Sequence, residues 1–244
     1  MTAYRTLVTT RRVLRQLAHD PRTVVLMLSV PCLLLTLLSW VYDASPQTFD
    51  RVGSALLGVL PLNTMFLVTS VSTLKERTSG TLERLLSLPL AKADLVVGYA
   101  LAFAVVAVLQ VALATSLAVH VLGVRVAGPV WLLLLVALWA SLLGIALGLS
   151  VSAFAVTEYQ ALQFAPAVLL PQILVSGLLV PRGSMPSVVR AVADWSPISR
   201  VVDAEAEVRL HPDLTVAFGR DLAFVAAWVV LVLLVGAATL RRRS

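Results

Sequence analysis

The chain has 244 residues, of which 59% are hydrophobic and only 13% are charged. Soluble domains carry roughly 25% charged residues, so this composition excludes a water-soluble globule. The formal net charge of +6 does not indicate a nucleic-acid partner. The positive charge flanks apolar stretches, where it fits a role in membrane topology and in contact with lipid headgroups.

Residues 1–22 predict a basic amphipathic helix that lies in the headgroup plane of a membrane. Leucine side chains occupy one arc of a helical wheel, and the opposite arc carries Arg5, Arg12, Arg15 and His19. The pair Asp20-Pro21 ends this helix, because a residue before proline disfavours the helical conformation. The next apolar stretch is long enough to span a bilayer, so we do not interpret this segment as a signal peptide.

Six apolar stretches are each long enough to cross a bilayer, whose hydrocarbon core of about 30 Å needs roughly 20 helical residues. The predicted spans are 23–42, 52–74, 95–122, 130–156, 161–180 and 222–240. The predicted fold class is therefore an all-α integral membrane protein with six transmembrane helices, organised as a single domain over residues 1–244.

Arg and Lys are concentrated on one side of these spans. They lie in residues 1–22, in the 75–94 loop and in the C-terminal tail, whereas the short loops of the other side carry only Arg51 and Arg125. Because cytoplasmic loops are enriched in Arg and Lys, we predict that both termini are cytoplasmic. Segment 181–216 then lies outside. Its apolar residues recur at helical spacing and predict two short re-entrant helices that dip toward the outer membrane surface.

Motifs for catalysis and nucleotide binding are missing from the sequence. No Gly-x-x-x-x-Gly-Lys-Ser/Thr loop can hold nucleotide phosphates, Cys32 is the single cysteine, and the three histidines lack ligand spacing. No charged residue lies in the middle of a span, where proton-driven transporters hold their coupling ion. We therefore expect no catalytic, metal or nucleotide site and no cofactor bound by this chain. If the chain transports, a partner supplies the energy.

The loop after the second span predicts a short amphipathic helix. Gly80 permits a turn, Glu83 suits the positive end of the helix dipole, and Pro89 ends the helix. Its apolar face consists of Leu82, Leu85 and Leu86. Such a helix fits the groove of a partner protein, and a connector that lies on lipid would have the same pattern.

Residues 76–90 read Glu-Arg-x-x-Gly-Thr-Leu-Glu-Arg-Leu-Leu-x-x-Pro-Leu. This run resembles the signature loop of type-2 ABC exporter permeases, especially the daunorubicin/doxorubicin-resistance branch. A later run is similar to the second signature of that family and contains Ser176-Gly177, Pro181, Met185-Pro186 and Trp195-Ser196-Pro197. The resemblance covers the whole chain, from the basic amphipathic start to the Arg-rich end.

The resemblance implies a type-2 ABC transporter transmembrane domain in a bacterial plasma membrane, surrounded by membrane lipids. Two permease chains, identical or sisters, pair above two copies of an ABC ATPase that carries ATP and Mg. Residues 1–22 become the interfacial helix, 75–94 the coupling-helix loop and 181–216 the outer re-entrant segment. The implied ATPase-coupling residues are Gly80, Thr81, Leu82, Glu83, Arg84, Leu85, Leu86 and Pro89.

A conduit between the two protomers is also implied, lined by the first, second and fifth spans. The residues that fit this lining are Ser29, Thr36, Asn63, Phe66, Ser70, Gln163, Phe164 and Gln172. Their mixture of polar and apolar groups suits amphipathic cargo. The same residues also fit helix packing, because Ser and Thr bond their own helix backbone and Asn and Gln bridge helices. Gly144 and Gly148 have the spacing of a helix-dimer motif, but the resembled fold does not place the fourth span at the centre of the dimer, so we predict that they pack within one chain.

These observations predict the membrane-spanning permease subunit of an ATP-driven exporter of drug-like or lipid-like amphiphiles, with ATP hydrolysis on a partner chain. A permease for polysaccharide or lipid-linked glycan is an alternative within the same class. A stand-alone secondary transporter is disfavoured by the missing intramembrane charges. A membrane protein that only anchors or inhibits a partner is disfavoured by the signature loop alone.

Overall fold

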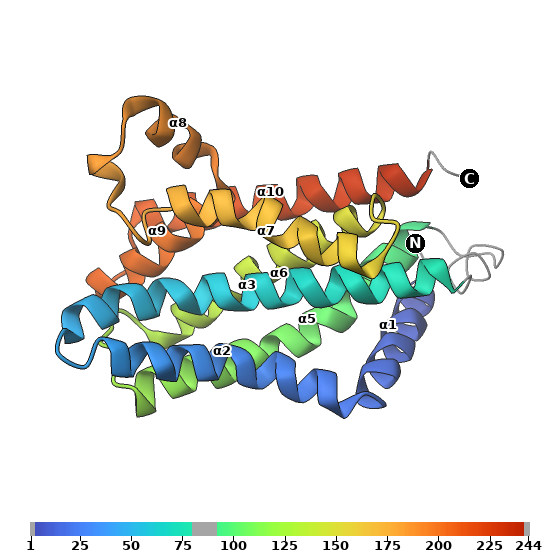
Figure 1. Cartoon of the computed structure of the whole chain (residues 1–244), viewed down its shortest axis with the longest axis horizontal. Coiled ribbons are helices and arrows are strands. Elements are labelled where there is room, and N and C mark those ends of the chain that lie inside the picture. Colours follow the sequence, from blue (N-terminus) through green and yellow to red (C-terminus); the bar gives the residue numbers. More distant parts are fainter. Residues whose placement is uncertain (1–2, 80–91, 242–244) are drawn as a thin grey trace.

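A computed structural model describes residues 3–79 and 92–241, and its regular secondary structure there is helical (Figure 1). The helices are α1 (Ala3–Ala18), α2 (Pro21–Val41), α3 (Pro46–Thr78), α5 (Lys92–Ser116), α6 (Val130–Ser152), α7 (Glu158–Val175), α8 (Ser187–Trp195), α9 (Pro197–Leu210) and α10 (Val216–Arg241). A π-helical turn, Leu117–Val121, extends α5, and a 3-10 turn occupies Arg182–Ser184. The all-α prediction is confirmed for the described residues.

Five helices are long and apolar enough to cross a membrane within the described ranges, where the sequence predicted six spans. They are α2, α3, α5 with its π-helical turn, α6 and α10. The predicted fifth span, 161–180, corresponds to α7, which has 18 residues and ends at Val175. Glu158, three glutamines and two internal prolines make α7 more polar than the other long helices.

Although it is more polar, α7 runs the length of the bundle. Its first residue, Glu158, lies 3.6 Å from Lys75 near the end of α3. The residues that follow α7, Ser176 and Gly177, share a cavity with Arg51 and Ser54 near the beginning of α3. Accordingly α7 and α3 are antiparallel. Helix α10 begins at the opposite end of the bundle from α1 and runs back to the end where α1 lies (Figure 1).

The centre of the bundle is the contact between α3 and α6, where two glycines bring the backbones together. A Cβ on Gly144 would lie 2.2 Å from the carbonyl oxygen of Leu62, and one on Gly148 would lie 2.6 Å from that of Phe66. Only glycine permits so close an approach. The prediction that Gly144 and Gly148 pack within one chain is confirmed.

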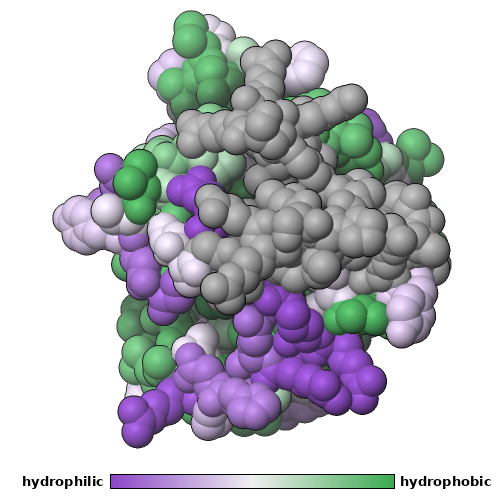
Figure 2. Space-filling view, turned by 90° about the vertical axis from the view of Figure 1, so that its right-hand side faces the viewer, coloured by the Kyte–Doolittle hydropathy of each residue, from purple (hydrophilic) through white to green (hydrophobic). Residues whose placement is uncertain are grey.

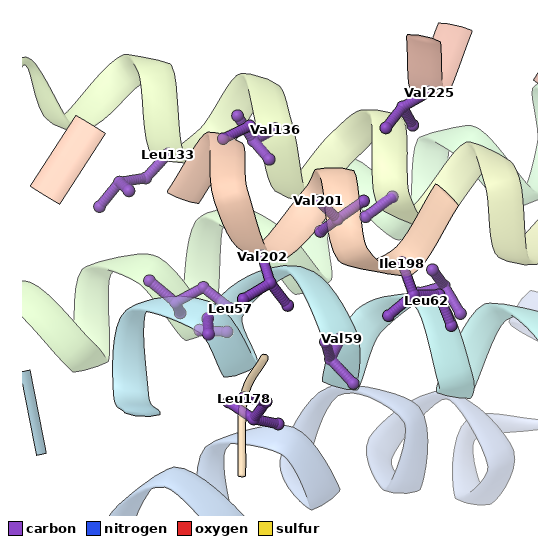
Figure 3. Close-up of a cluster of buried hydrophobic side chains, with 14 of the residues drawn as sticks. Leu57, Val59, Leu62, Leu133, Val136, Leu178, Ile198, Val201, Val202 and Val225 are labelled. Atoms are coloured by element: carbon purple, nitrogen blue, oxygen red, sulfur yellow. The ribbon is translucent and has the colours of Figure 1, made fainter. Parts of the chain in front are cut away.

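A third layer of this core comes from α9. Ile198, Val201 and Val202 are buried between α3 and α6 (Figure 3). Gly58 of α3 makes room for this helix, because a Cβ there would lie 2.5 Å from Cγ1 of Val201. The segment that was predicted as two short helices thus contains α8, which projects from the bundle, and α9, which packs into its end (Figure 1).

A proline in α2 is matched by a buried amide on α5. Pro31 has no N–H, so the carbonyl of Met27, four residues earlier, has no partner within its own helix. The Nε2 atom of Gln110, which is fully buried on α5, donates to this carbonyl at 2.9 Å. Freed carbonyls in membrane helices need such a partner because water is absent.

The link between Gln110 and Pro31 predicts a thermodynamic coupling. We expect Gln110→Met to lower the free energy of unfolding, because it leaves the Met27 carbonyl unsatisfied, a loss of about 1–3 kcal/mol that removal of the buried, unpartnered Gln110 Oε1 partly offsets. In a Pro31→Ala background, the new alanine supplies the missing N–H, so the same Gln110→Met change should cost about 1 kcal/mol less. Thermal unfolding of the four purified proteins in detergent measures this cycle, and equal losses in both backgrounds would contradict it.

Candidate functional site

An apolar groove lies between α3 and α7 at mid-height of the bundle and has a volume of about 470 Å³. Aliphatic side chains of both helices form its walls, and the only amide among the described lining residues is that of Asn63. The α3 wall is Leu56, Val59, Leu60, Asn63 and Leu67, and the α7 wall is Leu162, Ala165, Pro166, Leu169, Leu170 and Ile173.

Two further cavities continue this groove toward the two ends of the bundle. A cavity of about 400 Å³, lined by α1, α2, α3 and α5, shares Leu67 and Leu162 with the groove. At the other end, a cavity of about 280 Å³ shares Leu178 with it. We call the three together the α3–α7 furrow. Its middle is apolar, whereas Lys75 and Glu76 line one end and Arg182 and Asp203 the other.

Of the residues predicted to line a conduit, Asn63 borders the furrow directly. Ser29 of α2 and Gln163 of α7 are exposed on the surface of the described chain, and Phe164 is half-buried against the core. Thr36 donates to the carbonyl of Cys32 within its own helix at 2.8 Å. The walls of the central groove thus come from α3 and α7. Ser29 and Gln163 lie on the exposed surfaces of α2 and α7, away from that groove.

Three other predicted lining residues take part in helix packing in this structure. Phe66 and Ser70 are fully buried on the side of α3 that meets Gly148. Gln172 donates to the carbonyl of Val168 at 3.0 Å and accepts a hydrogen bond from Ser196, which links α7 to the start of α9. In this conformation, a change at any of these three positions acts on helix packing.

The end of the furrow near α1 is organised by three consecutive charged residues at the end of α3. Lys75 faces Glu158 at the start of α7, at 3.6 Å. Glu76 accepts a hydrogen bond from Arg12 of α1 at 2.8 Å. Arg77 donates to the backbone carbonyls of Ala153 and Ala155, which follow α6. The end of α3 is therefore tied to α1, α6 and α7 at once.

Arg12 extends this junction to α5, because it also donates to the hydroxyl of Tyr99, and its guanidinium lies 5.7 Å from the centre of that ring. Helix α1 lies close to α5, where Thr10 donates to the carbonyl of Gly98 at 3.1 Å. Figure 2 views this end of the molecule, where hydrophilic residues gather on the lower side. A surface cavity of α1 is lined by Arg11, Arg12, Arg15, Gln16 and His19 together with Val8.

The predicted coupling helix itself, from Gly80 to Pro89, lies outside the described residues. The structure does place the residue before it: α3 ends at Thr78, with Ser79 as its cap. The charged junction of Lys75, Glu76 and Arg77 is therefore within five residues of Gly80. The sequence did not reveal the partners of these three residues, because they come from helices far away along the chain.

A chain of ion pairs joins α8, α9 and α10. Arg182 pairs with Asp194 at the end of α8 and with Asp203 of α9. Asp221 of α10, which is almost fully buried, pairs with both Arg200 and Arg220 at 3.2 Å. Because Arg200 also approaches Asp203 at 3.9 Å, these pairs form a continuous network. They hold the 3-10 turn, α8, α9 and the start of α10 together at the end of the bundle opposite α1 (Figure 1).

Glu205 of α9 is a buried carboxyl that sequence reasoning missed. It is 0% exposed, and neither of its carboxylate oxygens has a hydrogen-bond partner in the described chain. Its Oε1 lies 3.4 Å from where a Cβ of Gly58 would stand. Burial raises the pKa of Glu205 well above its usual range. The signal was present, because Glu205 falls between Val201 and Val208 on the apolar face of the helix.

Replacement of this acid should change how stability depends on pH. The folded protein keeps the proton of Glu205, whereas the unfolded chain releases it above about pH 4.3, so stability falls as the pH rises. Glu205→Gln removes this dependence. We expect the Tm of the variant relative to wild type to increase from about pH 5 to about pH 8, measured in detergent. The exposed Asp213→Asn change is the control, and a difference independent of pH would contradict the prediction.

The bundle of long apolar helices with its furrow indicates a helical membrane protein, but it does not identify the family. Comparison with known sequences does. A sequence model of the ABC-2 type transporter family matches residues 4–207. This match covers most of the chain, and the chain therefore belongs to the ABC-2 type transporter family.

Curated relatives agree with this assignment. The chain is 25% identical over 183 residues to ABC transporter G family member 20 of Dictyostelium discoideum. It is 26% identical over 182 residues to the probable multidrug ABC transporter permease YbhR of Escherichia coli and 28% identical over 166 residues to YbhS. These alignments cover 72%, 75% and 68% of this chain but 24%, 48% and 44% of the relatives, so the chain spans at most about half of their length.

Proposed function

We propose that the chain is the membrane-spanning permease subunit of an ATP-driven exporter that moves amphipathic molecules. The observation that carries this proposal is the α3–α7 furrow in a chain of the ABC-2 type transporter family. Its polar ends and apolar middle match a molecule with both kinds of surface. The names of the two Escherichia coli relatives and the resemblance to the daunorubicin/doxorubicin-resistance branch support a drug-like or lipid-like cargo.

Under this proposal the chain crosses a bacterial plasma membrane six times, with both termini in the cytoplasm. α7 is the remaining span. Its 18 residues give a length of about 27 Å, close to the hydrocarbon thickness. Part of its polarity is accommodated within the bundle, because Pro166 borders the furrow and Gln172 is hydrogen-bonded to Val168 and Ser196. Helix α1 is then the interfacial helix, and α8 and α9 form the outer re-entrant segment.

The energy comes from two copies of a separate ABC ATPase that bind ATP and Mg. They dock beneath two permease chains, identical or sisters. The coupling segment Gly80–Pro89 follows directly on the Lys75–Glu76–Arg77 junction, which ties α3 to α1, α6 and α7. A displacement of the coupling segment is therefore passed to four helices together. Helix α2 exposes a long apolar face, including Leu26, Leu33 and Leu37, which suits a second permease or lipid.

Transport assays in cells test the proposal. We expect efflux of a fluorescent amphiphile only when the chain is produced together with its ATPase, and none when the ATPase cannot hydrolyse ATP. Asn63→Phe fills the middle of the furrow and should reduce efflux at least about fivefold, an effect of about 1 kcal/mol. Leu109→Phe is the matched control, because Leu109 is exposed on α5 and does not line the furrow. Unchanged efflux in Asn63→Phe would place the pathway elsewhere.

A further inference from the structure

The outer cavity of the furrow is rich in arginine. It is lined by Arg51 of α3, Arg182 of the 3-10 turn and Arg209 of α9, together with the hydroxyl-bearing Ser54 and Ser176. The one acidic residue in its described wall is Asp203, which is already paired with Arg182. Positive charge therefore exceeds negative charge around a space of about 280 Å³.

Arg51 and Arg209 differ from the neighbouring arginines in their lack of hydrogen-bond partners. The other arginines in this part of the chain that donate to a carboxylate or a backbone carbonyl are Arg182, Arg190, Arg200 and Arg220. The guanidinium groups of Arg51 and Arg209 make no ion pair or hydrogen bond to any residue that the structure describes. In Arg209 the Nε atom is buried and without an acceptor. Guanidinium N–H groups that are buried without an acceptor are costly.

The surroundings of Arg209 do not neutralise it. Burial lowers the pKa of Arg209, the negative charge of Asp50 raises it, and the positive charge of Arg51 lowers it again. Asp50 forms no ion pair with Arg209 among the described residues, and its Oδ1 accepts the backbone N–H of Arg125 at 2.9 Å. The cavity thus presents guanidinium donors whose geometry suits a phosphate or carboxylate.

The cavity also adjoins an apolar one. Leu178 lines both the arginine-rich cavity and the apolar groove between α3 and α7. A molecule that fills both spaces carries an anionic group at one end and hydrocarbon at the other.

We propose that the outer cavity is a subsite for the anionic headgroup, a phosphate or a carboxylate, of an amphiphile whose apolar part lies in the groove. The inference rests on the proposed function and deepens it by naming the chemical class of the cargo. Arg209 and Arg51 bind the headgroup, whereas the hydroxyls of Ser54 and Ser176 already donate to the carbonyls of Arg51 and Ile173. The order along the furrow directs the headgroup toward the outer surface.

Direct binding to the purified full chain in phosphatidylcholine nanodiscs tests this assignment. The probe is radiolabelled dodecyl phosphate, with empty nanodiscs subtracted, against dodecyltrimethylammonium and inorganic phosphate. We expect saturable binding of dodecyl phosphate, much weaker binding of inorganic phosphate and none of the cation at the same site. Arg209→Gln should weaken dodecyl phosphate about tenfold, the value of one charge-assisted hydrogen bond, and Arg209→Lys should weaken it less.

Arg125→Gln is the matched control, because Arg125 is an exposed arginine outside the cavity wall, and it should change the affinity less than about twofold. Unchanged Tm values show that the variants fold, as expected where an unpaired cation is removed. If Arg51→Gln with Arg209→Gln binds dodecyl phosphate as tightly as wild type, the proposal is overturned. It is also overturned if dodecyl phosphate binds no tighter than inorganic phosphate. Binding requires no ATPase, so a failure of transport is distinguished from a failure of this subsite.

Discussion

Gly144→Ala is expected to remove most of the folded protein. A methyl group at this position would lie 2.2 Å from the carbonyl oxygen of Leu62, 3.0 Å from its carbonyl carbon and 3.1 Å from its Cα. All three atoms belong to the backbone, so no rotamer change relieves the overlap. The α3 and α6 backbones would have to separate by roughly 1 Å, and the loss should reach about 3 kcal/mol or more.

The measurement is the yield of monodisperse protein after solubilisation, together with its Tm. Gly219→Ala is the matched control, because nothing lies within 4 Å of a Cβ at that position of α10, and alanine favours a helix over glycine. Gly53→Ala should lower the yield and the Tm by an intermediate amount, since the nearest neighbours of its new Cβ would be side-chain atoms at 3.4 Å. A normal yield and Tm in Gly144→Ala would show that the α3–α6 contact is looser than described.

The second large effect is expected at the charged junction of Lys75, Glu76 and Arg77 at the end of α3. Glu76→Arg would place two guanidinium groups together beside Tyr99 and repel α1 from α3. The pair is partly exposed, with 29% and 13% of the two side chains accessible, so its contribution to stability is modest, about 1 kcal/mol. Its contribution to coupling should be larger, because α1 and the end of α3 would no longer move together.

We expect Glu76→Arg to reduce cargo-stimulated ATP hydrolysis several-fold, whereas the ATPase still co-purifies with the chain. Combining it with Arg12→Glu restores opposite charges in swapped positions and should recover a large part of the stimulation. Stimulation and co-purification are measured on the same membranes. If the double variant is no better than Glu76→Arg alone, the ion pair is not what couples the two helices.

Much of the fold could be predicted from local sequence. The apolar stretches predicted five of the long helices, and Asp20-Pro21 marked the boundary where Asp20 caps α2 by accepting from Thr23 at 3.2 Å. The spacing of Gly144 and Gly148 predicted close helix packing, and the structure shows this packing between α3 and α6 of one chain. These features depend on residues adjacent along the chain or one helical turn apart, which periodicity detects.

The features that escaped prediction depend on which helices become neighbours. Periodicity placed Asn63, Phe66 and Ser70 on related positions of one helix, but the neighbours α6 and α7 decide that Phe66 and Ser70 are buried while Asn63 borders the furrow. Likewise, Glu205 lies in a segment that was expected outside the spans, and only the packing of α9 between α3 and α6 buries it.

The length of α3 has a mechanical consequence. Its 33 residues extend about 50 Å, which exceeds the hydrocarbon thickness of about 30 Å. A rigid rod of that length, tilted by about 5° around its middle, moves each end by roughly 2 Å in opposite directions. Pro61 would allow the rod to bend, but the adjoining Leu62 is clamped against Gly144. If α3 tilts relative to α7, a push on Glu76 therefore moves Arg51 in the opposite direction, so that the cavity at one end of the furrow narrows as the cavity at the other end widens.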